Sequence, residues 1–150
     1  MYRENSYTVI LLYLIDIDFC YQIFMKNLIK RAHPSTITEL SKIYIQKNIS
    51  QNEKIEILNS INQSIPNNIN KKFRIRLIYN NIFSQLKFNQ TNNFNDMYEI
   101  LICIENRIIY FLQNYFNNFS YTQLHTKNLL EKTIQEKKQT IQMFESYKTA

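Results

Sequence analysis

The sequence of 150 residues contains no glycine, and this absence limits both the folds and the sites that it can form. Phosphate-binding loops, dinucleotide fingerprints and nucleophile elbows need glycine, because they require positive φ angles or close approach of the backbone to a ligand. The sequence therefore excludes these motifs. Tight two-residue hairpins also prefer glycine, so a domain with many β-turns is disfavoured. An all-α fold is the remaining expectation.

Two segments carry apolar residues at alternating intervals of three and four, the spacing of one helix face. They predict helices over residues 7–32 and 96–115. Each stripe needs a partner surface, so both helices are expected in the core. Five residues of the two stripes are predicted to be almost fully buried: Ile17, Tyr21, Ile104, Ile108 and Phe111.

The rest of the chain completes a bundle. Residues 36–65 predict one long helix or two joined near Asn48, and residues 120–148 predict a last helix. Residues 71–86 predict a short helix, although their FRIRL segment also alternates like a strand. We expect one domain over residues 1–150, a four-helix bundle of up-down type with an extra short helix between helices 2 and 3. Capping pairs mark three helix starts: Ser35 or Thr36 with Glu39, Asp96 with Glu99, and Ser120 with Gln123.

Residues 7–25 are long enough to cross a membrane, and two acidic residues argue against that use. Asp16 and Asp18 would lie near the centre of the span, where each costs about 3 kcal/mol, while each apolar residue returns only about 0.3–0.6 kcal/mol. No cleavable signal pattern accompanies the segment. A buried helix is therefore predicted, with Asp18 facing water beside Gln22 and Lys26.

Basic residues outnumber acidic ones by 18 to 12, which gives a formal net charge of +6. The densest basic cluster supplies four candidate anion-binding residues, Lys71, Lys72, Arg74 and Arg76. Such a cluster is also typical of a solvated helix surface. We expect a protein partner or a second copy of the chain rather than nucleic acid or a membrane.

The residues that carry chemistry form no catalytic or metal-binding pattern. His125 has no carboxylate within one helical turn, and His33 precedes Pro34 in a turn. Asp16 and Glu105 are the acids closest to the apolar stripes, and we expect them at the edge of the core. No catalytic residue, metal or cofactor is predicted.

The two cysteines, Cys20 and Cys103, lie inside apolar runs, where a free thiol acts as a small hydrophobic group. This setting favours a reducing compartment, the cytoplasm or the interior of an organelle.

The leading functional hypothesis is a non-enzymatic bundle that works as a protein-interaction or assembly module. Apolar residues beyond the two main stripes are the expected contact surface: Val9, Leu12, Ile15, Ile102, Ile109, Leu112 and Phe116. Aromatic residues between the last two helices, Phe116, Phe119 and Tyr121, form a second expected patch. An alternative is a small basic subunit of a ribonucleoprotein or membrane complex. The many Ile and Asn residues, whose codons are rich in A and T, indicate an AT-rich genome.

Several short motifs resemble those of a known family. The first helix carries Asp16, Cys20 and Tyr21, and the third carries the segment EILICIENRIIYFLQNY over residues 99–115. Between them Tyr79, Ile82 and Leu86 fit a short aromatic helix. These features resemble a small bacterial family of ferritin-like four-helix bundles of unknown function. The resemblance implies the bundle fold and raises a third hypothesis, a ferritin-like metal-binding protein, and it assigns no functional residue.

Overall fold

The computed structural model describes residues 6–61, 70–84, 86, 93–116 and 124–148. Four long helices, a short helix and a π-helical turn make up the regular structure of these residues, which confirms the all-α prediction. The elements are α1 (Ser6–Arg31), α2 (Pro34–Ser60), α3 (Lys71–Ile78), η1 (Tyr79–Phe83), α4 (Phe94–Phe116) and α5 (Leu124–Tyr147).

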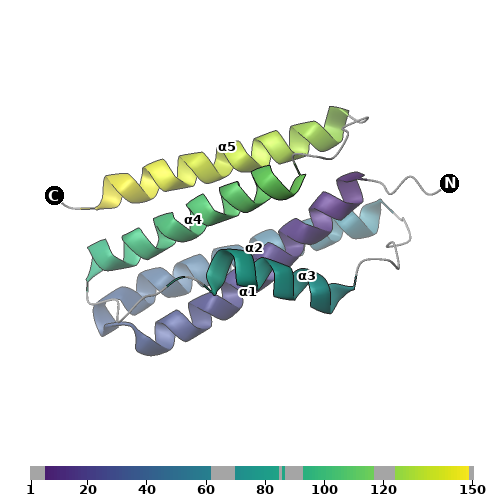
Figure 1. Ribbon diagram of the computed structural model, residues 1–150. Helices are drawn as coiled ribbons and strands as arrows, with labels where there is room; N and C mark the ends of the chain where they lie inside the picture. The colour runs from purple at the N-terminus through teal and green to yellow at the C-terminus, as the bar shows by residue number, and fades with distance from the viewer. Residues whose placement is uncertain (1–5, 62–69, 85, 87–92, 117–123, 149–150) are drawn as a thin grey trace.

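The long helices pack as two antiparallel pairs, α1 with α2 and α4 with α5 (Figure 1). The short α3 lies between the pairs in sequence, and it packs against α1 while η1 contacts both α1 and α4. Because α3 runs back along the bundle, α2 and α4 run in the same direction. The up-down order therefore holds within each pair.

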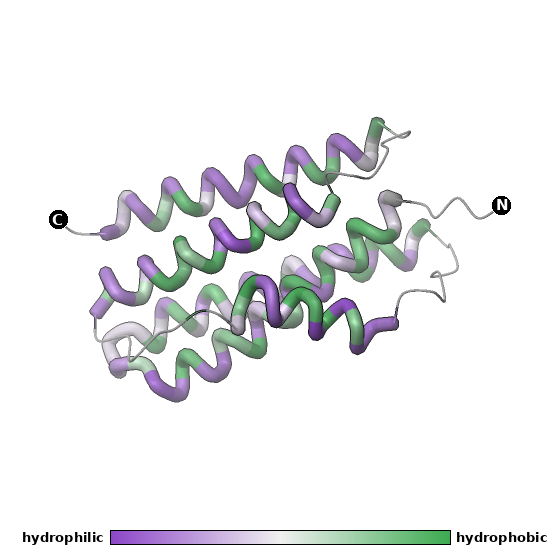
Figure 2. Tube along the Cα trace, viewed as in Figure 1, coloured by the Kyte–Doolittle hydropathy of each residue, from purple (hydrophilic) through white to green (hydrophobic). Residues whose placement is uncertain are grey.

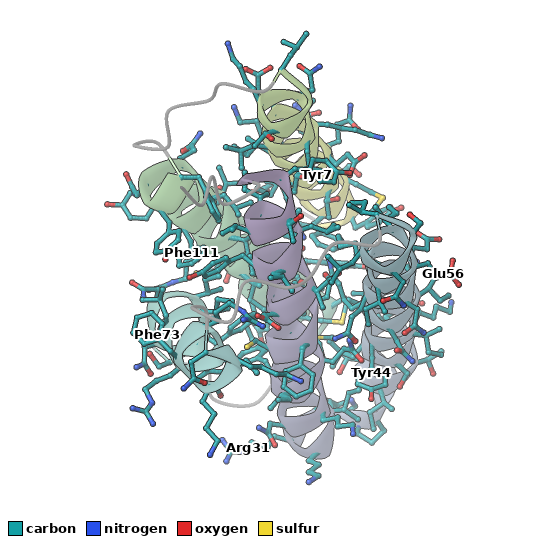
Figure 3. The ribbon with its side chains drawn as sticks, turned by 90° about the vertical axis from the view of Figure 1, so that its right-hand side faces the viewer. Tyr7, Arg31, Tyr44, Glu56, Phe73 and Phe111 are labelled. Atoms are coloured by element: carbon teal, nitrogen blue, oxygen red, sulfur yellow. The ribbon has the colours of Figure 1, made fainter. Side chains whose placement is uncertain are left out.

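Helix α1 is the central helix of the bundle. It contacts α2, α3, η1 and α5, and Tyr13 packs its ring against Phe111 and Tyr115 of α4. Figure 3 shows α1 in the middle, with the other helices around it. Its sequence is apolar over most of its length (Figure 2), which suits a helix covered on nearly every side.

The central position of α1 explains why it is as long and as apolar as a membrane-spanning helix. Over Tyr7–Arg31 the helix is long and apolar enough to cross a bilayer, and 83% of its most apolar window is buried inside the fold. These are the properties of a core helix. The five residues predicted for the core are confirmed, because Ile17, Tyr21, Ile104, Ile108 and Phe111 are all between 0% and 6% exposed.

The helix starts differ from the predicted ones. His33 caps the start of α2, and its Nδ1 accepts a hydrogen bond from the Ser35 amide at 3.2 Å. The Asn93 side chain accepts from the Asp96 amide at 2.9 Å, so Asn93 rather than Asp96 caps α4. The predicted cap at Ser120 lies outside the described residues. In both α2 and α4, a side chain two or three residues before the free backbone amide accepts its hydrogen bond.

The structure answers two questions that the sequence left open, namely whether residues 36–65 form one helix or two and whether residues 71–86 begin as a helix or a strand. Helix α2 continues unbroken through Asn48 to Ser60, so residues 34–60 form one helix, and residues 62–65 of the predicted element lie outside the described residues. Residues 71–83 are helical throughout, and Asn70 caps them by accepting from the Lys72 amide at 2.9 Å. The alternation in FRIRL therefore does not mark a strand, and it does not follow burial either, because Arg74 is buried while Phe73 is 60% exposed.

Candidate functional site

Three carboxylates on α1 and α4 lie inside the bundle. Asp16 and Asp18 are each 3% exposed, and Glu105 is fully buried. The predictions that Asp16 and Glu105 lie at the core edge and that Asp18 faces water are wrong. The reason is that α3 covers the Asp16 side of α1 and α2 covers the Asp18 side. Burial of a carboxylate costs several kcal/mol, so each of them needs a cation from a neighbouring helix.

Asp16 pairs with Arg74 of α3, whose Nε donates to Oδ2 at 2.5 Å. Both side chains are buried. Burial raises the pKa of Asp16, and the Arg74 guanidinium offsets only part of this rise. Nearby, the Cys20 thiol donates to the Ile75 carbonyl over 3.9 Å. These polar contacts fix α3 against α1.

Asp18 makes the corresponding contact with α2. It accepts hydrogen bonds from Lys54 Nζ at 2.6 Å and from Ser50 Oγ at 3.1 Å. One turn further along α1, the Gln22 amide donates to Gln51 Oε1 at 2.8 Å. Asp18 and Gln22, which were expected to face water, therefore form a polar seam between α1 and α2, whereas Lys26 on the same side of α1 is exposed as expected.

Glu105 is the centre of a cluster to which every long helix contributes one residue: Tyr21 of α1, Lys47 of α2, Glu105 of α4 and Lys137 of α5. We call these four residues the central cluster. Lys137 Nζ lies 3.0 Å from Oε2 of Glu105, and Lys47 Nζ lies 3.5 Å from Oε1. The Lys47 ammonium also lies 4.5 Å from the centre of the Tyr21 ring, as in a cation–π contact. The Tyr21 hydroxyl is buried beside Glu105 and makes no hydrogen bond of ordinary geometry with any described residue.

The charges of the central cluster influence one another strongly. Burial alone raises the pKa of Glu105, and the ammonium groups of Lys137 and Lys47 outweigh it, so the pKa lies below its usual value. Burial and the nearby Lys137 charge lower the pKa of Lys47 to about 8. Burial also acts to lower the pKa of Lys137, but Glu105 overcomes this effect and raises it. Lys137 is therefore the firmer partner of Glu105.

The residue types of the central cluster are better suited to holding the helices in a fixed position relative to one another than to binding a metal ion. Two ammonium groups beside one carboxylate repel a further cation. Among the described residues, no group of three or more His, Cys, Asp or Glu side chains could hold a metal ion. The His125 side chain itself lies outside the part of the chain that the structure describes. Together with the Asp16 and Asp18 pairs, the cluster joins α2, α3 and α5 to the core helices.

Sequence reasoning missed Lys47 and Lys137, and one signal could have found them. Lys137 lies seven residues after Leu130 and seven before Phe144, and both of these are buried. Lys47 likewise lies seven residues after the buried Leu40. A spacing of seven keeps a residue on the same helix face. A lysine on an apolar face indicates a buried ion pair, provided that an acid on another core stripe can meet it.

The four candidate anion-binding residues do not form one surface. Arg74 is 5% exposed and pairs with Asp16, whereas Lys71, Lys72 and Arg76 are exposed. These three surround a shallow hollow at the start of α3, together with Asn70 and Ile75. The reason for the split is the helical phase, which turns position 74 towards α1.

The two cysteines differ in exposure. Cys20 is buried, as expected, but the prediction for Cys103 is wrong, because its side chain is exposed on the outer side of α4. Burial raises the pKa of the Cys20 thiol to about 12. Only Cys103 is placed to react with a reagent in solvent.

We expect the folded protein to react with one equivalent of a thiol reagent such as DTNB, and with two equivalents after unfolding. The first equivalent should disappear in Cys103→Ser, whereas Cys20→Ala should keep it. Absorbance of the released thiolate measures both stages. Rapid reaction of two equivalents with the folded chain would contradict the burial of Cys20.

A groove of about 1110 Å³ runs along the outer side of α4. It lies between η1 with the end of α3 on one side and the end of α5 on the other. Arg107 bridges α4 to η1 by donating to the Asn81 carbonyl at 3.3 Å, and Lys148 lies 3.5 Å from Glu99 at the other end. The lining includes aromatic, aliphatic and polar side chains, among them Leu77, Ile102, Cys103, Arg107, Tyr110 and Phe111.

Most of the residues that were predicted to form a contact surface are buried. All seven residues expected to contact a partner are buried, because the other helices close around α1 and α4: Val9, Leu12, Ile15, Ile102, Ile109, Leu112 and Phe116. Of the predicted aromatic patch, Phe116 is buried in the core, and Phe119 and Tyr121 lie outside the described residues. Exposed apolar residues occur elsewhere, notably Tyr110 in the groove and three isoleucines on α2, Ile45, Ile49 and Ile57.

Comparison of the chain with protein-family models, curated proteins and solved structures gave no match. The chain is a small all-helical protein with several long helices, and no family is identified.

Proposed function

We propose that this chain is a non-enzymatic helical module that binds a helical segment of another protein in the groove along α4. The observation that carries the proposal is Tyr110, which is 71% exposed and lines the groove along α4. An exposed tyrosine in a concave surface is typical of the anchor residues of protein interfaces.

The charges of the groove favour a helix over a phosphate-rich ligand. Glu99 and Glu145 balance Arg107 and Lys148, so the groove has no excess of positive charge. Ile102 and Phe111 contribute apolar surface at its floor. An amphipathic helix would place apolar residues on this floor and polar residues at the charged rim.

The interior charges support a non-enzymatic role. The buried acids each pair with a lysine or arginine of a neighbouring helix, an arrangement typical of structural ion pairs. The basic-subunit alternative rests on Lys71, Lys72 and Arg76, which surround the hollow at the start of α3. Membership of the ferritin-like family is also a proposal, supported by the order of the helices and by polar residues at the bundle centre.

Cys103 gives a direct test, because it is an exposed thiol inside the groove. A photo-crosslinker attached to Cys103 is expected to capture one defined protein in extracts of the source cells. The captured band should be lost in Tyr110→Ser, because the anchor is removed, and kept in Leu124→Ser, a matched control that is 73% exposed and lies outside the groove. Equal capture by both variants would reject the groove as the binding surface.

A further inference from the structure

Two helices, α1 and α3, carry exposed cations that equal in number the whole positive excess of the chain. The six residues are Lys26, Lys30, Arg31, Lys71, Lys72 and Arg76. Of the 18 basic residues in the sequence, the other 12 are matched in number by its 12 acidic residues. None of the six cations forms an ion pair with a described residue. The two acids of α1, Asp16 and Asp18, are buried in pairs of their own, and α3 contains no acid.

The α1 lysines belong to a stripe that faces away from the core. Four residues spaced four, three and four apart form this stripe: Phe19, Ile23, Lys26 and Lys30. At about 100° per residue, Lys26 lies half a turn from Leu28, which is fully buried. Ile23 on the same stripe is 37% exposed. The outward side of α1 is therefore apolar near its middle and basic towards its C-terminal end.

Helix α3 continues this surface. The Lys71 ammonium lies 5.8 Å from the centre of the Phe19 ring, so the start of α3 adjoins the outward stripe of α1. Lys72 and Arg76 lie one turn apart on α3, each about half a turn from Arg74. Because Arg74 is buried in its pair with α1, the other two side chains point away from α1.

Exposed apolar side chains lie among these cations on both helices. Phe73 is 60% exposed and lies three residues before Arg76, and Ile23 lies three residues before Lys26. Figure 3 shows Phe73 on α3, on the opposite side of α1 from α2. We call the surface formed by the six cations with Phe19, Ile23 and Phe73 the basic face.

We propose that the basic face binds the surface of an anionic lipid bilayer. Six cations on two helices that expose no acid match an anionic partner in charge. A bilayer also provides an apolar layer beneath its headgroups, where Phe73 and Ile23 can insert while the cations stay at headgroup level. Nucleic acid matches the charge, but it provides no such layer for an isoleucine. None of the six cations lines the groove along α4, so this inference does not depend on the proposed function.

Co-sedimentation of the full chain with lipid vesicles tests the proposal. Vesicles of phosphatidylserine and phosphatidylcholine in equal parts are expected to bind the parent chain, whereas vesicles of phosphatidylcholine alone are not. Lys72→Glu/Arg76→Glu on α3 should weaken binding at least about twentyfold, because each lost cation accounts for about a factor of five. The matched control, Lys127→Glu/Lys132→Glu, makes the same change of net charge at exposed positions of α5 and should weaken binding less than about threefold. Equal losses in the two variants would overturn the proposal.

Two further variants test the α1 part of the face and its apolar part. Lys26→Glu/Lys30→Glu should weaken vesicle binding as much as Lys72→Glu/Arg76→Glu does. Phe73→Ser keeps every charge and should weaken it about tenfold, because the inserted side chain is lost. A parent chain that ignores the anionic vesicles would overturn the proposal. Tighter binding to a DNA duplex of mixed sequence, lost in Lys72→Glu/Arg76→Glu and unchanged in Phe73→Ser, would assign the basic face to nucleic acid instead.

Discussion

Glu105→Gln is expected to destabilise the protein by about 3–5 kcal/mol, the range for removing one partner of a buried ion pair. The substitution keeps the shape of the side chain and removes its charge. Lys47 and Lys137 would then lie together in the bundle centre without the carboxylate that now separates their charges. A loss of this size is a large part of the 5–15 kcal/mol that stabilises an ordinary domain. Urea unfolding followed by circular dichroism measures it.

Two further variants make the result specific. Glu99→Gln removes a carboxylate from the same helix, where Glu99 is 66% exposed and contacts Lys148, and it should change stability by less than about 1 kcal/mol. The triple variant Glu105→Leu/Lys47→Met/Lys137→Met removes all three charges together and should recover most of the stability. If Glu105→Gln unfolds at the same urea concentration as the parent, Glu105 is not buried between the two lysines.

Ile108→Ala should cost about 2–5 kcal/mol, because it removes a large aliphatic side chain from a closed core. Ile108 is fully buried on α4, on the stripe that the sequence predicts to face the bundle centre. Ile23→Ala is the control, since Ile23 lies on the core helix α1 but is 37% exposed. Its loss should be clearly smaller, and thermal melts compare the two. An unchanged melt for Ile108→Ala would mean that the α4 stripe is covered by a partner and not by the chain itself.

The fold could be predicted because the core helices repeat a single spacing. The stripes of α1 and α4 identify Ile17, Tyr21 and Ile108 as core residues, and each is 2% exposed or less. The helical spacing is recognised from residues within one or two turns of each other, and such residues are close together in the sequence. The absence of glycine reinforced the result by disfavouring a β-rich alternative.

The interior charges could not be predicted, because each partner comes from a distant part of the chain. Asp18 shares its side of α1 with other polar residues, so its position on the helix predicted that it faces solvent. It is buried instead because it contacts Lys54, which lies 36 residues further along the chain. Arg74 belongs to a basic run in sequence, yet its position on α3 turns it towards Asp16. Cys103 lies in an apolar run but faces outward on α4. Phase assigns a residue to a side of its helix, and the neighbouring helices decide whether that side is buried.

The most direct measurement of the central cluster is a double-mutant cycle between Glu105 and Lys137, followed by urea unfolding. Lys137→Met should be costly in the parent chain, because it leaves Glu105 with the weaker partner Lys47. In the Glu105→Gln background the same change should cost much less, since it removes one of two unbalanced charges. The expected coupling free energy is at least about 1 kcal/mol. Costs that simply add, to within about 0.5 kcal/mol, would show that the two side chains do not interact and would contradict an ion cluster at the centre of the bundle.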